Sequence, residues 1–154
     1  MRIVVDSSTL ISLAWAGQLP LLGCAPVALV IPAEVRREVV DEGLARGYPD
    51  AAAIESTVKV IADAGRSEEL RDLPVDDAVL VRAREHGVLL TNDLALGRRA
   101  LNTGVRWLRT ADFIVLCVRS GGLERLRGVA AVKALRAAGR ITEELLDAYL
   151  EELP

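Results

Sequence analysis

The chain has 154 residues and 51% of them are hydrophobic, which suits one domain with a buried core and excludes a largely disordered chain. Its formal net charge of -3 argues against a protein that coats nucleic acid in general, because such proteins are usually basic. It does not exclude nucleic-acid binding, because a cluster of site carboxylates lowers the formal charge and bound cations would offset it locally. No apolar run reaches the ~18 residues of a membrane span. The first apolar stretch is too short for a signal peptide, so we expect a cytoplasmic protein without a membrane partner.

Cysteine and histidine are too rare to build a site of their own. Cys24 and Cys117 lie far apart without metal-ligand spacing, and we expect small buried residues rather than a disulfide. The only histidine, His86, precedes Gly87 and is expected at the C-terminal end of a helix. A single histidine excludes a multi-histidine metal site, and it follows no nucleophile elbow, which argues against a Ser-His-Asp hydrolase.

The N-terminal stretch predicts a buried strand that ends in an acid. Residues 2–5 are mostly apolar, Asp6 follows, and an amphipathic pattern then predicts a helix to about residue 15, capped by Ser7 or Ser8. Sites in open α/β sheets lie at the C-terminal ends of strands. An acid at the end of a buried strand is also costly unless it is paired or bound to a metal. Asp6 is therefore the first candidate for a metal-binding carboxylate.

A second strand and a long helix are predicted next. Residues 27–31 are a continuous apolar run, typical of a strand buried on both faces. Pro32 stands where proline favours the start of a helix, and Gly43 is expected to end that helix. Three acids share its face: Glu34, Glu38 and Glu42.

The middle of the chain continues the alternation of helix and strand. We expect a short helix over residues 50–55, a third strand over residues 56–61 with Lys59 at an exposed edge, and a polar, at best helical, segment over residues 65–72. Pro74 then opens a strong helix over residues 78–85, apolar almost all round, with Asp76 and Asp77 in front of it.

The last third predicts two more strands. Residues 87–90 form a short apolar strand that ends in Thr91, Asn92 and Asp93, and a helix follows to about residue 102. Residues 105–108 are the fifth candidate strand, and Thr110 is expected to cap a helix over residues 111–119.

Gly121 and Gly122 mark the clearest break in the chain. Beyond them, residues 123–138 and 142–153 predict two amphipathic helices separated by Gly139. We therefore expect residues 1–120 to form a three-layer α/β/α domain with about five parallel strands, and residues 121–154 to form a helical hairpin packed on the same domain.

Four acids stand in comparable positions along this pattern: Asp6, Glu38, Asp77 and Asp93. Asp6 and Asp93 are the most informative, because both follow apolar strands at the same edge of the sheet. Neighbouring carboxylates repel each other unless a cation lies between them, and oxygen-only ligands suit Mg²⁺ or Mn²⁺. A metal held in this way activates water and clamps a phosphate oxygen, so phosphodiester hydrolysis is a natural reaction.

Each acid also has a simpler interpretation. Asp77 and Asp93 stand where aspartate often caps a helix, and Glu38 is one of several acids on one helix face. For Asp77 and Glu38 taken alone, capping or solvation is favoured. The four acids together, in these strand contexts, favour a site.

These segments resemble the PIN-domain family of metal-dependent nucleases. The resemblance rests on VVDSSTLI around Asp6, IPAEVRREV around Glu38, Asp77 followed by alanine, and GVLLTND ending at Asp93. It covers roughly residues 2–120 in the family's order and approximate spacing. The tail, from Gly122 to the threonine of the second helix, is similar to a bacterial and archaeal subgroup with an added C-terminal helical pair.

The resemblance implies a site, a reaction and partners. Asp6, Glu38, Asp77 and Asp93 would be the catalytic acids, with Asp6, Asp77 and Asp93 as ligands of Mg²⁺ or Mn²⁺, and they would be supported by Ser8, Thr91 and Asn92. The family cleaves RNA by metal-activated water. Many small prokaryotic members are VapC-type toxins held inactive by an antitoxin, often as dimers, so we expect an RNA substrate, an antitoxin partner and a homodimer.

The sequence also departs from the family pattern. Family members often carry a further acid two residues after the position of Asp93, where this chain has Ala95, which weakens the case for a second metal. Two assignments stay open, because Glu34 shares a helix face with Glu38 and Asp76 adjoins Asp77.

Arginines on the same helices as the acids are candidates for phosphate contact: Arg36, Arg37, Arg82, Arg84, Arg98 and Arg99. For any single one of them, ordinary surface charge is the favoured interpretation. The aromatic residues are scattered, so no cluster for base stacking is expected.

Two alternatives to a nuclease are compatible with parts of this pattern. A haloacid-dehalogenase-type phosphatase also begins with a strand and an aspartate, but it needs a second aspartate as general acid two residues later, where this chain has Ser8. The other alternative is a catalytically inactive PIN-like module that binds nucleic acid or protein, the latter through the C-terminal hairpin.

Overall fold

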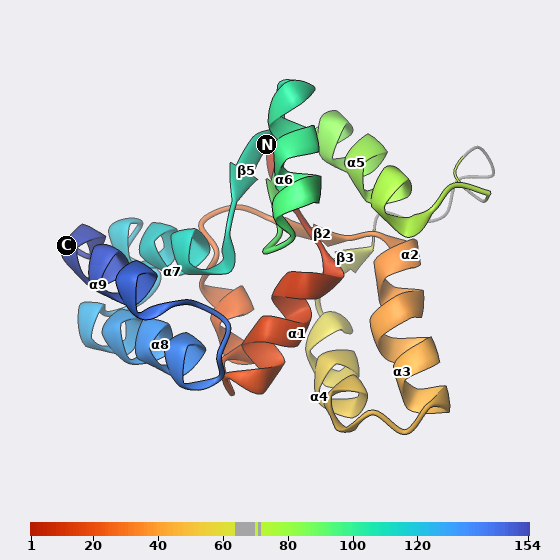
Figure 1. Cartoon of the computed structure of the whole chain (residues 1–154). Coiled ribbons are helices and arrows are strands. Elements are labelled where there is room, and N and C mark those ends of the chain that lie inside the picture. The colour runs from red at the N-terminus through yellow and green to blue at the C-terminus, as the bar shows by residue number, and fades with distance from the viewer. Residues whose placement is uncertain (64–69, 71) are drawn as a thin grey trace.

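The computed structural model describes residues 1–63, 70 and 72–154 (Figure 1). The segment predicted over residues 65–72 falls largely outside them. Within the described residues, five strands form one sheet in the order β3-β2-β1-β4-β5, and every neighbouring pair is parallel. The strands are β1 (Arg2–Val5), β2 (Leu29–Ile31), β3 (Ala62–Asp63), β4 (Gly87–Leu90) and β5 (Arg106–Leu108). The predicted α/β class and parallel sheet are confirmed.

The central strand β1 sets the register of the site. Its residue Val4 pairs with Val30 of β2 on one side and with Leu89 of β4 on the other. Val4, Val30 and Leu89 are all buried, because helices cover both faces of the sheet. The segments after β1 and β4 therefore leave the sheet side by side, at the same edge.

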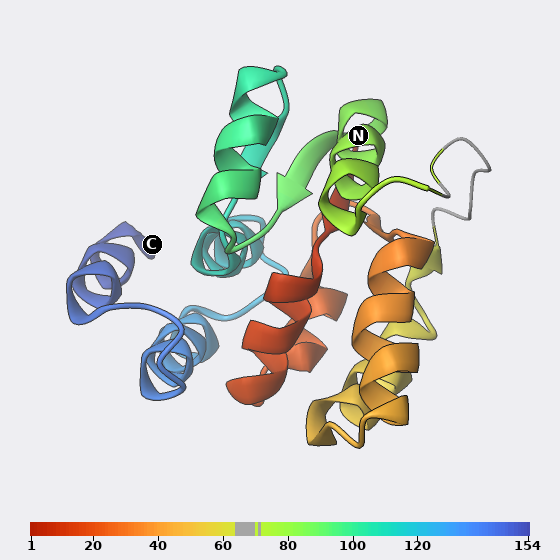
Figure 2. The same cartoon turned by 45° about the vertical axis from the view of Figure 1, so that its right-hand side comes forward.

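Helices form a layer on each side of the sheet (Figures 1 and 2). α5 and α6 lie together on one side, whereas α1, α4 and α7 lie on the other. The helical segments up to α5 are α1 (Ser7–Trp15), the 3₁₀ segment η1 (Leu19–Cys24), α2 (Ala33–Arg36), the π-helical segment η2 (Arg37–Asp41), α3 (Glu42–Ala45), α4 (Pro49–Val58) and α5 (Val75–His86). Those after β4 are α6 (Leu94–Asn102), α7 (Thr110–Arg119), α8 (Arg125–Ala137) and α9 (Glu143–Glu152).

The predicted strand over residues 56–61 is wrong. Helix α4 runs to Val58, and the strand begins only at Ala62. Ala51, Ile54 and Val58 are buried and follow helical spacing, so burial of this face outweighs the strand preference of the β-branched residues. The hydroxyls of Ser56 and Thr57 donate to carbonyls four residues earlier, which lets both residues fit a helix.

Gly43 does not end its helix, contrary to the prediction. Helical structure continues through α3 to Ala45, and Gly47, with φ at 72°, makes the turn. Gly43 is buried, and a Cβ atom there would lie 2.9 Å from the Cβ of Ala51. This glycine therefore serves the close approach of α3 and α4 rather than a chain reversal.

Other local predictions are confirmed. His86 is the last residue of α5, and Gly87 caps that helix in the left-handed conformation, with φ at 94°. Cys24 and Cys117 are both free thiols, but only Cys117 is buried as predicted, whereas Cys24 is partly exposed. Burial raises the pKa of the buried Cys117 thiol to about 12, which keeps it un-ionised at neutral pH.

The C-terminal helices α8 and α9 pack against α7, and α8 also contacts α1 (Figure 2). Their buried residues Leu123, Val132, Leu135, Tyr149 and Leu153 belong to the same hydrophobic cluster as the strands. Gly128 allows the contact between α7 and α8, because a Cβ there would lie 2.5 Å from Val118. The division at residue 120 stays a prediction. In the part of the chain that the structure describes, no helix has the length and apolarity to cross a membrane.

Candidate active site

Asp6 lies at the end of β1 and occupies the N-cap position of α1, where Ser7 or Ser8 was predicted, but its side chain makes no capping hydrogen bond. Its backbone N–H donates to the carbonyl of Leu90 at 3.0 Å, which ties it to the end of β4. The side chain is 2% exposed, and its carboxylate accepts hydrogen bonds from Thr91 Oγ1 at 2.7 Å, Ser8 Oγ at 3.0 Å and Ser7 Oγ at 3.4 Å. The hydroxyls of Ser8 and Thr91 are the two short donors that satisfy this buried carboxylate, whereas the single proton of Ser7 is shared with Glu38.

Ser8 and Thr91 link the loops that follow β1 and β4. Their hydroxyl oxygens lie 3.0 Å apart, and each also accepts a backbone N–H, from Asn92 and Asp93 respectively, at 3.0 Å. The two predicted supporting hydroxyls are thus in contact with Asp6 and with the segment that carries Asp93. Their arrangement fixes the separation of the two loops at the sheet edge.

Asn92 has a different role from the two hydroxyl residues. Its Nδ2 donates to Ser12 Oγ at 2.9 Å, and its Oδ1 accepts the backbone N–H of Thr110 at 3.0 Å. The side chain therefore joins α1 to the start of α7, and only its backbone N–H reaches the Asp6 network, through Ser8.

Asp93 combines a cap with a position beside the site. Its Oδ1 accepts the backbone N–H of Leu96 at 3.1 Å, so the capping interpretation of this residue holds. Its own backbone N–H donates to Thr91 Oγ1, the same hydroxyl that donates to Asp6. Asp6 and Asp93 thus share one hydrogen-bonded residue between them.

Glu38 lies in the π-helical segment η2 and approaches the site from the other side of Asp6. Its carboxylate accepts a hydrogen bond from Ser7 Oγ at 3.2 Å. The pKa of Glu38 is raised, first by burial and then by the negative charges of Asp6 and Asp76, while the Ser7 hydrogen bond opposes the rise. Single π turns inside helices are frequent at functional sites.

The two adjacent aspartates at the start of α5 are in different surroundings. The pKa of Asp76 is raised first by partial burial and then by the negative charges of Asp6 and Asp93. Asp76 therefore interacts electrostatically with the acids at the sheet edge. Asp77 forms an ion pair with Arg99 on α6. The sequence left these two residues as alternatives and preferred Asp77. Because Arg99 engages Asp77, Asp76 is taken as the site residue in the proposal below.

Glu34, the alternative to Glu38, is buried at the start of α2, with a side chain oxygen that has no hydrogen-bond partner among the described residues. Glu34 is not among the charges that raise the pKa of Glu38. The structure therefore associates Glu38, rather than Glu34, with Asp6.

The donor chemistry of these acids fits a hard divalent cation. Asp6, Glu38, Asp76 and Asp93 offer only carboxylate oxygens. The pKa values of Glu38 and Asp76 are raised first by burial and then by the charges of neighbouring acids, and a bound cation would oppose both effects. In their present side-chain conformations, no three His, Cys, Asp or Glu residues in the described part of the chain lie close enough to hold one ion.

A comparison with protein families agrees with this arrangement. A family model described as a PIN domain matches residues 2–153. The chain belongs to the PIN-domain family. No curated protein and no solved structure matches the chain significantly. The match extends over the C-terminal helices. PIN domains are generally nucleases, so this protein has a nuclease-type fold and belongs, at that coarse level, among the hydrolases.

Several arginines predicted as phosphate ligands have structural partners instead. Arg36 donates to the carbonyl of Val58 at 3.3 Å, Arg82 forms an ion pair with Glu85 at 3.3 Å, and Arg99 pairs with Asp77. Sequence reasoning missed two other arginines, Arg109 and Arg140, which line a cleft next to Asn92. No motif marks them, because they come from segments far apart in the chain.

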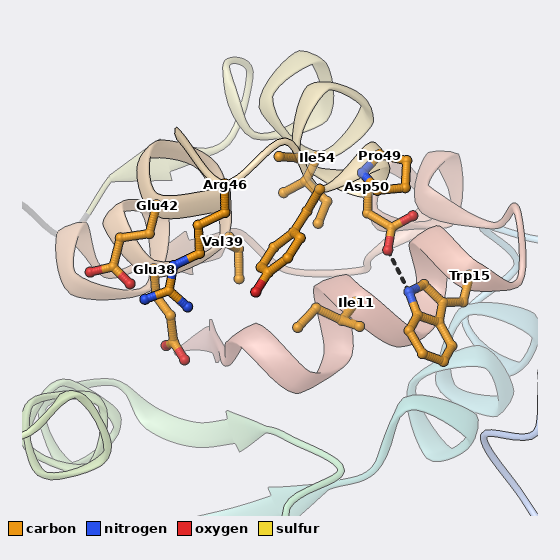
Figure 3. Close-up of a pocket in the computed structure, with 11 residues that line it drawn as sticks. Ile11, Trp15, Glu38, Val39, Glu42, Arg46, Pro49, Asp50 and Ile54 are labelled. Carbon is orange, nitrogen blue, oxygen red and sulfur yellow. Dashed lines mark hydrogen bonds between the residues drawn. The ribbon is translucent and has the colours of Figure 1, made fainter. Parts of the chain in front are cut away.

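A larger pocket lies beside Glu38, between α1, α4 and the helical stretch of η2 and α3 (Figure 3). Its volume is about 590 Å³, and its lining includes Ile11, Val39 and Ile54. Trp15 stands at one end, where its indole N–H donates to Asp50 (Figure 3). The acids Glu38, Glu42 and Asp50 outnumber the single cation Arg46 in the lining, so this pocket is a poor surface for a polyanion.

Proposed function

We propose that this protein is a metal-dependent endoribonuclease that hydrolyses RNA phosphodiester bonds. The observation that carries the proposal is the buried Asp6 carboxylate, held by Ser8 and Thr91, with Glu38, Asp76 and Asp93 around it at one edge of the sheet. A cluster of carboxylates at the C-terminal ends of parallel strands is a suitable binding place for a cation and a phosphate.

Each residue has a defined part in this proposal. Asp6, Asp76 and Asp93 would hold Mg²⁺ or Mn²⁺, and Glu38, with its raised pKa, lies where it can exchange a proton with water. Bound metal of this kind lowers the pKa of water and neutralises charge on a phosphate oxygen. Ser8 and Thr91 orient Asp6 through hydrogen bonds to its carboxylate, and such supporting contacts tune metal sites.

We propose further that the protein acts in the cytoplasm as the toxin of a toxin–antitoxin pair and works as a homodimer. Support comes from its membership of the PIN-domain family and from the motifs around Asp6 and Asp93, which resemble those of VapC-type proteins. An antitoxin would be a protein that binds the chain and blocks the acid cluster.

The test compares wild type with Asp6→Asn on labelled single-stranded RNA in the presence of Mg²⁺ or Mn²⁺. The variant should lose at least about 100-fold in cleavage rate, since even partners of metal ligands contribute 10–100-fold. Asp147→Asn, which changes an exposed acid on α9, is the matched control and should cleave normally. Thermal melts show whether each variant is folded. Unchanged cleavage by a folded Asp6→Asn protein would overturn the assignment.

A further inference from the structure

A cleft of about 300 Å³ begins where the acid cluster ends. It lies between the loop after β4 and the C-terminal helices, and Asn92 and Leu94, the two neighbours of Asp93, are part of its wall. Across from them, Arg140 and Thr142 come from the connection between α8 and α9. The cleft therefore joins the proposed active site to the C-terminal hairpin, and its size is at the lower end for ligand sites.

The charge of this cleft is opposite to that of the pocket in Figure 3. Its lining contains two arginines, Arg109 and Arg140, and no acid, whereas the pocket beside Glu38 is mainly acidic and apolar. A polyanion that reaches the acid cluster is attracted toward the cleft and repelled from the pocket beside Glu38.

Both arginines are held in place by aromatic rings. The guanidinium of Arg140 lies over the ring of Trp15 at 5.1 Å, and that of Arg109 lies over the ring of Trp107 at 5.0 Å. Arg140 Nε also donates to Ser12 Oγ at 2.9 Å, the same hydroxyl that accepts the hydrogen bond from Asn92. A ring covers one face of each guanidinium group, and Ser12 accepts the Nε–H of Arg140, so phosphate oxygens would bind to the remaining N–H groups.

The rest of the lining suits a nucleotide. Apolar side chains of Leu94, Ala111, Ile141 and Leu145 stand in the cleft together with Tyr149. An apolar surface accommodates the flat faces of bases without reading their sequence, while the arginines neutralise the backbone. The cleft thus places two cationic side chains beside an apolar wall.

We infer that Arg109 and Arg140 position single-stranded RNA by binding backbone phosphates on the β4 side of the acid cluster, so that the C-terminal hairpin forms part of the substrate surface. This inference rests on the proposed ribonuclease function and names residues that the family pattern does not supply. Because the contacts are to phosphates, both arginines give affinity without sequence preference.

The test measures binding separately from cleavage. Asp6→Asn protein in EDTA is titrated against a fluorescein-labelled single-stranded RNA of about 12 nucleotides, and anisotropy is followed over a range of salt concentrations. Adding Arg109→Gln or Arg140→Gln should weaken binding about fivefold near 0.1 M salt and reduce the slope of log K against log salt by about 0.7 each. A purely structural role would leave that slope unchanged.

The control is Arg127→Gln, which removes the same charge from an exposed position on α8 outside the cleft, and it should leave the slope unchanged. Arg140 also contacts Ser12 and Trp15, so its replacement could disturb the fold. Melting curves show whether each variant is folded, and Arg140→Lys keeps the positive charge. Lysine should retain the slope even if binding is weaker.

Two failures are distinguishable. If wild type cleaves RNA and Asp6→Asn does not, but both arginine variants bind with unchanged slope, only the cleft assignment is overturned. If no RNA is cleaved but the arginine variants still lose binding, the cleft assignment stands as an RNA-binding surface and the proposed catalysis fails.

Discussion

Asp76 and Asp77 show how two identical side chains at adjacent positions acquire different properties. Residues next to each other on a helix point about 100° apart, so only one of a pair can face a given neighbour. Here the pKa of Asp76 responds to Asp6 and Asp93, whereas Asp77 pairs with Arg99. The difference gives a sharper test of the site than removal of any acid alone.

The matched pair Asp76→Asn and Asp77→Asn should therefore differ in activity. Both substitutions remove one charge from the first turn of α5, so both lose a similar interaction with the helix dipole. We expect Asp76→Asn to reduce Mg²⁺-dependent cleavage by about 10–100-fold or more, and Asp77→Asn to stay within about twofold of wild type. An equal loss of cleavage in both variants, or a loss in Asp77→Asn alone, would show that Asp77 belongs to the active site.

At the scale of elements, the close contact of α6 with β5 supports the site from outside. Gly97 on α6 lies against the ring of Trp107, where a Cβ atom would come within 2.0 Å of the ring. Trp107 in turn donates its indole N–H to the carbonyl of Thr91 at 3.0 Å and lies under Arg109. Gly97, which is on the helix that Asp93 caps, thus controls the position of two residues beside the acids.

Gly97→Ala should destabilise the protein by about 1–3 kcal/mol, because the added methyl group must displace Trp107. The displacement should also lower cleavage, since Thr91 carries a hydrogen bond to Asp6. Arg98→Ala, at the next and exposed position of α6, is the control and should stay within about 0.5 kcal/mol of wild type. Chemical denaturation measures both, and equal stability of Gly97→Ala and wild type would show that the ring moves without cost.

Elements were predicted well where burial and local pattern agree, and poorly where they conflict. The strands β1 and β4 are short apolar runs buried on both faces, and their sequence alone identified them. Residues 56–61 look like a strand, but Val58 belongs to the buried face of α4, because contact with α1 and η2 decides its conformation.

At the scale of the whole molecule, the acid cluster opposes folding in the absence of a cation. The pKa values of Glu38 and Asp76 are raised above their ordinary values of 4.5 and 3.8, so the folded state keeps protons that the unfolded chain has released. The metal-free protein should therefore lose stability as the pH rises from the ordinary pKa values through the raised ones, because the two carboxylates must then be charged while they are partly buried and near other acids.

Mg²⁺ or Mn²⁺ at neutral pH should reverse this loss. At a concentration about 100 times the dissociation constant, a bound ion stabilises by about 2.7 kcal/mol, which raises Tm by about 5–10 °C for a chain of this size. The double variant Asp6→Asn, Asp93→Asn should show no such shift in a thermal melt with and without EDTA. An equal rise in Tm for wild type and the double variant would place the ions elsewhere.

The sequence by itself determined the α/β class, the parallel strands and the strand-end acids Asp6 and Asp93, because these depend on hydrophobic pattern and on position next to a buried strand. Only the tertiary structure favoured Asp76 over Asp77 and brought Arg109 and Arg140 together beside Asn92. Those relations depend on how helices rotate and pack across the sheet. Local sequence patterns do not predict contacts between residues as far apart in the chain as Ser12 and Arg140.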